Sequence, residues 1–335
     1  MIISNTDNSY SKVLATLLEN QSWQSPLHTQ SALNYYRQRP EDEGKTIQDQ
    51  SFILVWENEP VVAFLGATVK EEKRRNLLAY EAPCIVIENK AKLTTKAAKS
   101  FLKKFDQMTE NINGSIWCRD FLIDGDLSSL SKHLLNKVAR TKPVFFQIID
   151  LNNDTSSMKS NIRKSYKSLI NWGIRELQPK VFDATNITWE LMDEFRQLHI
   201  HEAGRETRSV DSWRQQFNMV KAGDAFVVFG SNKDKLVSAG LFMHSKTNCY
   251  YGVSASRRDL FEKPMFHSLM WTAVLHGKEL GCKWFEVGEQ LYPNHPHENP
   301  PTQKELGISE FKAGFGGETK MFIDLKLDCE ELQYG

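Results

Sequence analysis

The chain has no excess of charge of either sign. Its 335 residues contain 42 Lys and Arg against 42 Asp and Glu, so the formal net charge is zero. No global field would therefore draw the molecule to nucleic acid or to an anionic membrane, and any phosphate binding would need a local cluster of basic residues.

Cysteines are few, scattered and odd in number. None of the five belongs to a CxxC pair; they are Cys84, Cys118, Cys249, Cys282 and Cys329. This spacing argues against a zinc ribbon and against a disulfide framework, and it predicts buried, reduced thiols.

Long apolar runs are also missing. The first thirty residues are polar and lack the apolar core of a signal peptide. No run of about 18 apolar residues, the length needed for a transmembrane helix, occurs elsewhere. We expect a soluble, cytoplasmic protein, and at roughly 150 residues per domain the length predicts two domains.

The first half contains short apolar runs that read as strands. Runs at 52–56 and 61–68 flank a Glu-Asn-Glu-Pro turn and predict a hairpin. Further patterns predict strands at 83–88, 115–119 and 144–151 and helices at 96–109 and 127–139.

Residues 155–172 predict a helix that ends at Gly173. Lys159, Arg163 and Lys167 recur along it at intervals of four, and Lys164 lies beside them. Such a row is usually a solvated face. Because it lies at the junction of the two halves, it also suits a phosphate clamp for a nucleotide-linked or lipid-linked acceptor, with Arg163, Lys164 and Lys167 as the phosphate-binding residues.

The order of the predicted helices and strands in the second half indicates a particular fold. Its periodicities predict, in sequence, helices at 187–202 and 210–221, strands at 225–230, 236–244 and 248–254, a helix at 265–280, a strand at 283–288, a helix near 304–313 and a strand at 319–326. The order ααβββαβαβ is the layout of the GNAT fold. We predict an α/β (α+β) class with two tandem GNAT-like domains, 1–180 and 181–335, each with a mixed, largely antiparallel sheet flanked by helices.

The strand at 283–288 carries an unusual carboxylate. With a period of two, Trp284, Glu286 and Gly288 share one face. A carboxylate in an apolar strand is costly unless it is paired or useful, and an amine nucleophile needs a base to lose its proton. Glu286 and the following Glu289 are therefore catalytic candidates, with a sheet-edge salt bridge as the alternative for Glu286.

The motif FKAGFGG at 311–317 places Lys312 between two aromatic residues and before three glycines. A lysine here could hold a phosphate or stabilise a developing oxyanion. Lys312 is the third catalytic candidate, and a plain helix-to-strand turn with a solvated lysine is the alternative.

Several residues are candidates for substrate binding. Arg205 and Arg208 lie in HEAGRETR, between the first two helices of the second domain, and suit carboxylate, phosphate or sugar recognition. Tyr251 and His267 lie on the predicted strand and helix that flank the crossover, and Lys304 begins the segment KELGIS. The pairs His199 with His201 and His295 with His297 make poor metal sites, so we predict no metal.

Three segments carry a resemblance to a known family. They are NIRKSYKSLINWG at 161–173, YYGVSASRRDLFEKPMFHSLMWTAVLHGKELGCKWFEVGEQ at 250–290 and KELGISEFKAGFGGE at 304–318. The chain resembles the FemAB family, whose members carry two GNAT-like domains, and it is most similar to bacterial members associated with surface-polysaccharide or amino-sugar pathways. The long helical hairpin inserted in the founding members is missing here.

The resemblance implies an N-acyltransferase or aminoacyltransferase that acts on the amine of an amino-sugar or cell-envelope precursor. The donor would be acyl-CoA or aminoacyl-tRNA, with no permanently bound cofactor. Residues 257–264 contain no glycine that could cradle the pyrophosphate of coenzyme A, so both donors stay open. The alternative is a non-catalytic module that binds a glycan or a nucleotide sugar.

Overall fold

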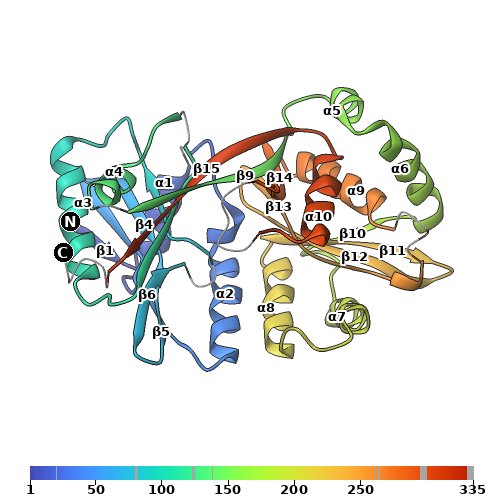
Figure 1. Cartoon of the computed structure of the whole chain (residues 1–335), viewed down its shortest axis with the longest axis horizontal. Helices are drawn as coiled ribbons and strands as arrows, with labels where there is room; N and C mark the ends of the chain where they lie inside the picture. Colours follow the sequence, from blue (N-terminus) through green and yellow to red (C-terminus); the bar gives the residue numbers. More distant parts are fainter. Residues whose placement is uncertain are drawn as a thin grey trace. The chain divides into compact units, whose positions relative to one another are not determined.

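The computed structural model describes residues 1–19, 21–79, 82–122, 125–137, 139–260, 262, 265–294 and 300–329, the side chains of 40–42 excepted. The chain splits into two compact units (Figure 1). The first comprises residues 1–23, 39–144 and 321–335, and the second comprises 24–38 and 145–320. This division does not coincide with the predicted boundary at residue 180, because the helices that follow residue 150 pack within the second unit.

The first unit contains two groups of strands. An antiparallel sheet has the order β1-β3-β4-β7 (Ile2–Ser4, Phe52–Trp56, Glu59–Leu65, Ile85–Glu88). A second group has the order β15-β8-β6-β5-β2 (Glu318–Asp328, Ser115–Asp120, Arg74–Leu78, Ala67–Glu71, Thr46–Asp49). Helices α1 (Tyr10–Leu18), α3 (Thr95–Thr109) and α4 (Ser129–Asn136) pack on these strands.

The predicted hairpin of the first half is confirmed. Trp56 pairs with Glu59, so the turn is the dipeptide Glu57-Asn58. Both residues have positive φ, as a two-residue hairpin turn requires. Pro60 lies in β4 rather than in the turn.

The second unit is built on one mixed sheet of order β10-β11-β12-β13-β14-β9. Its strands are β10 (Lys180–Phe182), β11 (Ala225–Asn232), β12 (Lys235–His244), β13 (Asn248–Ser256), β14 (Trp284–Gln290) and the end of β9 (Arg140–Asp150). Neighbours are antiparallel except β13 and β14, which are parallel because helix α9 (His267–Glu279) crosses over between them. The predicted order ααβββαβαβ is confirmed. The elements are α7 (Trp189–Ala203), α8 (Val210–Lys221), β11–β13, α9, β14, α10 (Gln303–Ala313) and β15. The short strand β10 and the 3-10 turns at Pro26–His28 and Arg258–Leu260 were not predicted.

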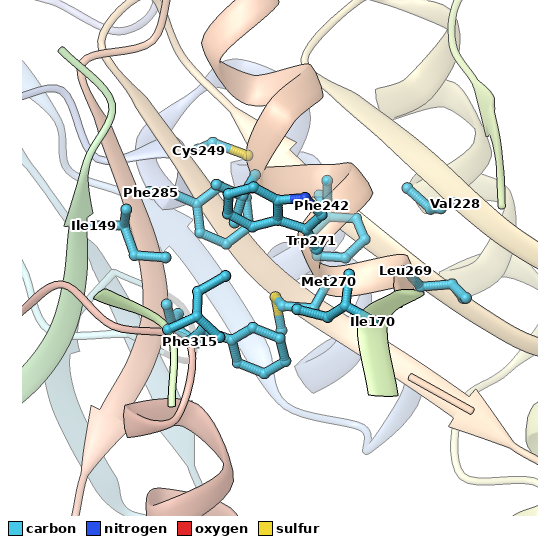
Figure 2. Packing of buried hydrophobic residues seen from close by; sticks show 14 of the residues in the cluster. Ile149, Ile170, Val228, Phe242, Cys249, Leu269, Met270, Trp271, Phe285 and Phe315 are labelled. Carbon is cyan, nitrogen blue, oxygen red and sulfur yellow. The ribbon is translucent and has the colours of Figure 1, made fainter. Parts of the chain in front are cut away.

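Side chains that alternate along the strands of this sheet belong to two hydrophobic cores, one on each face. Val228 and Phe242 face the core that includes Ile170 and Leu269, and Figure 2 shows these side chains together with Trp271 in this core. The residues one position away along β11 and β12 join the core that contains α7 and α8. The sheet is therefore buried on both faces, and its strands read as continuous apolar runs.

The helix predicted at 155–172 is in fact two helices, α5 (Thr155–Asn161) and α6 (Lys164–Leu177). Ile162 has an extended conformation, and the backbone N–H of Arg163 donates to Gly314 O at 2.9 Å instead of continuing the first helix. Gly173 does not end the helix; it lies inside α6, where a Cβ atom would strike the side chain of Ser268. The helix ends at Gln178, which has a left-handed conformation.

All five cysteines are buried free thiols. Within the part of the chain that the structure describes, no helix is long and apolar enough to cross a bilayer.

Candidate functional site

The two parallel strands of the second unit separate partway along their length. They pair over Asn248–Tyr250 and Trp284–Glu286, whereas β13 continues to Ser256 and β14 to Gln290. Beyond the last pair, the facing backbone edges of β13 and β14 make no ladder bonds to each other. We call the unpaired stretches of the two strands beyond this point the wedge, and the last pair its apex; Tyr251 follows the apex in β13, and Gly288 lies two residues after it in β14.

Glu286 lies at the apex of this wedge. Its side chain is 3% exposed, and its Oε1 accepts a hydrogen bond of 2.9 Å from Asn248 Nδ2. Asn248 Oδ1 in turn accepts from Thr247 Oγ1 at 2.7 Å and from the backbone N–H of Gln24 at 3.2 Å. The carboxylate is thus part of a buried polar network that joins the starts of β13 and β14.

A β-bulge changes the predicted alternation along β14. Glu286 opposes Ile148 and Gly288 opposes Gln147, so Val287 is the extra residue. The prediction that Glu286 and Gly288 share one face by simple alternation is wrong, because the bulge interrupts the period of two. Gly288 has φ +125°, and the position of its absent Cβ lies 2.8 Å from Lys312 Nζ.

Lys312 therefore occupies the space that a side chain at position 288 would fill. Its ammonium donates to Glu289 O at 3.2 Å. Burial lowers the pKa of Lys312, and the nearby charge of Glu289 partly offsets this effect. Of the three predicted catalytic residues, the structure brings Lys312 and Glu289 together, whereas Glu286 is engaged with Asn248.

The glycines after Lys312 allow three close backbone approaches. A Cβ at Gly314 would strike the ring of Tyr166, one at Gly316 would lie 2.9 Å from Asn161 O, and one at Gly317 would strike Ile148 O. The motif FKAGFGG is thus the packing surface on which α5, α6 and β9 converge. This close packing fixes the end of α10, the helix that carries Lys312.

A cavity of about 530 Å³ lies beside the open part of β13. Its walls come from the end of α7, the end of β13, the residues before and at the start of α9, and Phe311 of α10. Tyr251 and His267, both predicted to bind substrate, line it. The Tyr251 hydroxyl shares a 2.5 Å hydrogen bond with Ser254 Oγ, and burial raises the pKa of Tyr251.

His267 stands at the start of α9 among aromatic rings. Its ring meets Tyr166 edge-on at a centroid distance of 4.4 Å and Phe311 at 5.2 Å. Tyr166 also meets Phe315 edge-on, at a centroid distance of 5.3 Å. Of these rings, His267 and Phe311 line the cavity, and Tyr166 and Phe315 pack behind them.

Glu202 and His199 of α7 also line the cavity. The Glu202 carboxylate accepts from the backbone N–H of Arg258 and from His201 Nδ1, both at 2.8 Å. It also lines a second, more polar cavity of about 490 Å³ with Arg257 and Asp259, which form a bidentate ion pair with each other. Glu202 therefore anchors the segment before α9 to α7.

The predicted substrate-binding residues outside the cavity have different positions. Arg208 donates to His199 Nε2 at 3.1 Å and to the Tyr35 hydroxyl at 3.0 Å. Arg205 and Lys304 are exposed and are not among the residues that line the described cavities.

Two of the three predicted phosphate-binding residues are engaged within the protein. Arg163 lies over the ring of Tyr166 and donates to Glu310 O at 3.3 Å, while Lys167 donates to Ser160 O at 3.0 Å. Lys164 is exposed. The break between α5 and α6 also interrupts the predicted row of charge, since Lys159 belongs to the shorter helix.

No group of three or more metal-binding side chains occurs among the residues that the structure describes. His295 and His297, considered as a metal pair from the sequence, lie outside these residues.

Comparisons with known proteins agree with this fold. No family model and no curated protein sequence matches the chain. Among solved structures, FemX matches with a TM-score of 0.71 at 10% identity, over 100% of this chain and 98% of that one. The chain has a FemX-like tandem GNAT fold.

Two further solved structures match over most of the chain. L-PGS from Bacillus licheniformis matches with a TM-score of 0.57 at 14% identity, over 94% of this chain and 91% of that one. A tandem GNAT protein from the clavulanic acid biosynthesis pathway matches with a TM-score of 0.52 at 10% identity, over 98% of both chains. The predicted FemAB-like fold is confirmed, and the polysaccharide branch stays a prediction.

Three residues of this site could hardly be recognised before the structure was known. Asn248 is an ordinary polar residue at a strand start, and its bond to Glu286 depends on the strand pairing. Glu202 lies within the HEAGRETR motif, but its role depends on Arg258, 56 positions later. His199 was considered only as half of a metal pair, and its partner is the arginine nine positions later in the same motif.

Proposed function

We propose that the second unit transfers an acyl or aminoacyl group to the amine of an amino-sugar or cell-envelope precursor. The observation that carries this proposal is the separation of β13 from β14 beside a cavity of about 530 Å³. Open strand edges bind extended chains through backbone hydrogen bonds. A donor with amide groups in a linear arm would pair with these edges and present its acyl carbon near the apex of the wedge.

Lys312 and Glu289 are the polar groups proposed for the chemistry. Attack of an amine on an acyl carbonyl builds negative charge on the carbonyl oxygen, and a buried ammonium stabilises this charge better than water does. Glu289 is the more accessible carboxylate and is proposed to accept the proton of the attacking amine, directly or through water. Glu286 is proposed to hold the apex of the wedge through Asn248.

The donor stays open between acyl-CoA and aminoacyl-tRNA. Arg257 is paired with Asp259. The Arg258 side chain lies 3.9 Å from the Glu202 carboxylate but is 62% exposed, so it could also meet a phosphate group of either donor. The acceptor is proposed to enter the cavity lined by Tyr251 and His267.

The test combines ligand binding with transfer. Thermal shifts with acetyl-CoA, aminoacyl-tRNA and UDP-amino sugars identify the ligands, because a ligand that binds the folded state raises the midpoint of unfolding. Transfer to the amine is then measured for the wild type, Lys312→Ala, Glu289→Gln and Glu286→Gln, with Lys320→Ala as a control at an exposed lysine that pairs with Glu318.

We expect Lys312→Ala and Glu289→Gln to lose transfer at unchanged fold, whereas Lys320→Ala keeps it. Full activity of folded Lys312→Ala would refute the site assignment. Stabilisation by a sugar nucleotide, without transfer from any donor, would support the non-catalytic binding module instead.

A further inference from the structure

The first unit has a cavity of its own, bounded by the hairpin of β5 and β6 and by the C-terminal half of α3 with the residues that follow it. Its volume is about 280 Å³, and its surface is mainly polar. All its lining residues belong to the first unit, and none of them lines the cavity beside β13. Pockets that enclose a drug-sized ligand have volumes of roughly 300–1,000 Å³, so this cavity suits one small chemical group.

Every charged residue that lines this cavity is a cation. Arg75 comes from β6 and Lys104 from α3, and no carboxylate is among the lining residues. The carboxylate of Asp106 in α3 is bonded instead to His133 and Lys137 of α4. A cavity that has two cations and no acid attracts anions.

The pairing of the two strands places a third cation on the same face of the hairpin. Lys70 of β5 lies directly opposite Arg75, whereas Glu71 lies opposite Arg74. Side chains that are directly opposite share one face; opposite charges in such a pair stabilise the strands, and like charges destabilise them. The hairpin therefore balances its charges on one face and leaves two cations together on the face that carries Arg75.

The donors around this cavity are not engaged within the protein. In the part of the chain that the structure describes, no hydrogen bond or ion pair involves the side chains of Lys70, Arg75 and Lys104. The same holds for the amides of Gln107 and Asn111, which also line the cavity. An arginine offers a planar fork of N–H groups, a lysine a compact charge, and each amide an NH₂ group. Two charged and two neutral donors therefore line one cavity.

The end of α3 opposes an anion here, but its effect is the smaller one. The helix ends at Thr109, so the carbonyl groups of its last turn and its negative dipole end are close in sequence to Asn111. A helix dipole changes the affinity for one charge by about two- to fivefold at an exposed position. A hydrogen bond from a charged group changes it by about ten- to hundredfold, so two cations outweigh the helix end.

We propose that this cavity binds the dianion of a phosphate monoester or of free phosphate, with Arg75 and Lys104 as charged donors and Gln107 and Asn111 as neutral ones. Such a group has three oxygens free to accept and carries close to two negative charges, so it matches both cations and accepts from several donors at once. A phosphate diester has only two free oxygens and one charge, and it matches the site less well. The proposal does not rest on the proposed acyl transfer.

Phosphorus nuclear magnetic resonance titrations of the full chain, in buffer without phosphate, test the site with inorganic phosphate, uridine monophosphate and dimethyl phosphate. We expect inorganic phosphate to bind the wild type, and Arg75→Gln and Lys104→Gln to bind it about tenfold more weakly. Lys103→Gln is the matched control, because Lys103 is exposed beside Lys104 and does not line the cavity; it should keep the wild-type affinity. Dimethyl phosphate, a diester, should bind the wild type about tenfold more weakly than inorganic phosphate.

The comparison of the two monoanion sources identifies where the phosphate comes from. Uridine monophosphate that binds more tightly than inorganic phosphate, with the same loss in Arg75→Gln, would support the proposal with a nucleotide as the ligand. Uridine monophosphate that binds equally or more weakly would support it with the free anion as the ligand.

Thermal unfolding gives a second readout, from the opposed cations. Without phosphate, Arg75→Gln should unfold at or above the wild-type temperature, because it removes the like charge opposite Lys70. Added phosphate should raise the midpoint of the wild type and of Lys103→Gln more than that of Arg75→Gln, since general salt effects act on all three alike.

Three results would overturn the proposal: no binding of inorganic phosphate to the wild type, an unchanged affinity in both Arg75→Gln and Lys104→Gln, or an equal loss in Lys103→Gln. Dimethyl phosphate that binds as tightly as inorganic phosphate would overturn the choice of a dianion. Phosphate binding with the expected dependence, in a protein that transfers no acyl group, would support this site and count only against the proposed function.

Discussion

Replacing Gly288 with alanine tests whether the bulge in β14 exists to make room for Lys312. The added Cβ would lie 2.8 Å from Lys312 Nζ and 3.1 Å from its Cε, and the backbone at φ +125° disfavours any side chain. Since Lys312 is long and flexible, we expect the lysine to move and the strand to keep its place. The ammonium would then leave Glu289 O.

The expected cost has two parts. Backbone strain at a residue held outside the favoured regions is about 1–3 kcal/mol, and loss of a hydrogen bond from a charged group adds about 1.5–3 kcal/mol. Gly281→Ala is the matched control, because Gly281 also has positive φ, at +83°, but has no atom within 4 Å of an added Cβ. We expect Gly288→Ala to be about 1–3 kcal/mol more destabilising than Gly281→Ala.

Urea denaturation of both variants, each with and without Lys312→Ala, gives the free energies of unfolding. Removing the lysine should shrink the excess cost at position 288 and leave the cost at 281 unchanged, as expected for residues in contact. Equal costs for the two glycines, or an excess that persists without the lysine, would refute the account of the bulge. Transfer activity should be lost in Gly288→Ala and kept in Gly281→Ala.

Three further predictions concern stability. His199 stays neutral in the folded state down to about pH 4, so the free energy of unfolding should fall as the pH drops from 6.5 toward 4. With the partial exposure of the ring discounted, the fall should exceed that of His199→Asn by on the order of 1–2 kcal/mol. Parallel curves of unfolding free energy against pH for the wild type and the variant would contradict this. Asp324 accepts from Arg119 at 2.6 and 2.9 Å, so Asp324→Ala should cost about 3–5 kcal/mol in urea denaturation, and a loss below about 1 kcal/mol would be inconsistent with a buried pair. Thr302 opens α10 with a capping box, so Thr302→Ala should lower stability by about 1 kcal/mol, and Thr302→Ser should not.

Much of the second unit could be predicted from local signals. Helix α8 has the bounds expected from the sequence, because Ser209 caps its start and the apolar period is regular. The strands β11–β13 were found to within two residues, since turns of polar residues separate apolar runs. These features depend on neighbours along the chain.

The break between α5 and α6 could not be predicted in this way. Ile162 and Tyr166 keep the apolar stripe of a continuous helix, and no proline or glycine marks the break. What ends the first helix is the bond from Arg163 N–H to Gly314 O, which joins residues 151 positions apart. The prediction that Gly173 ends the helix failed for a related reason. The glycine allows close contact with Ser268 inside the helix and does not terminate it.

The candidate residues of the site could be chosen from the sequence, but the contacts that each of them makes could not. Glu286, Glu289 and Lys312 do lie on one strand and the helix after it. The bulge at Val287 separates the first from the other two, and no periodicity in the sequence reveals a bulge. Arg208 was selected for its charge, yet its charge serves His199 and Tyr35.

Helix α10 is secured at both ends, and this bears on how its lysine would act. The capping box closes the first turn, and Arg163 holds the last through Glu310 O and Gly314 O. These bonds hold the backbone that carries Lys312 from both ends of the helix. A mobile ammonium would have to be ordered when negative charge develops on a substrate, and this ordering costs free energy. Here that cost is met when the chain folds.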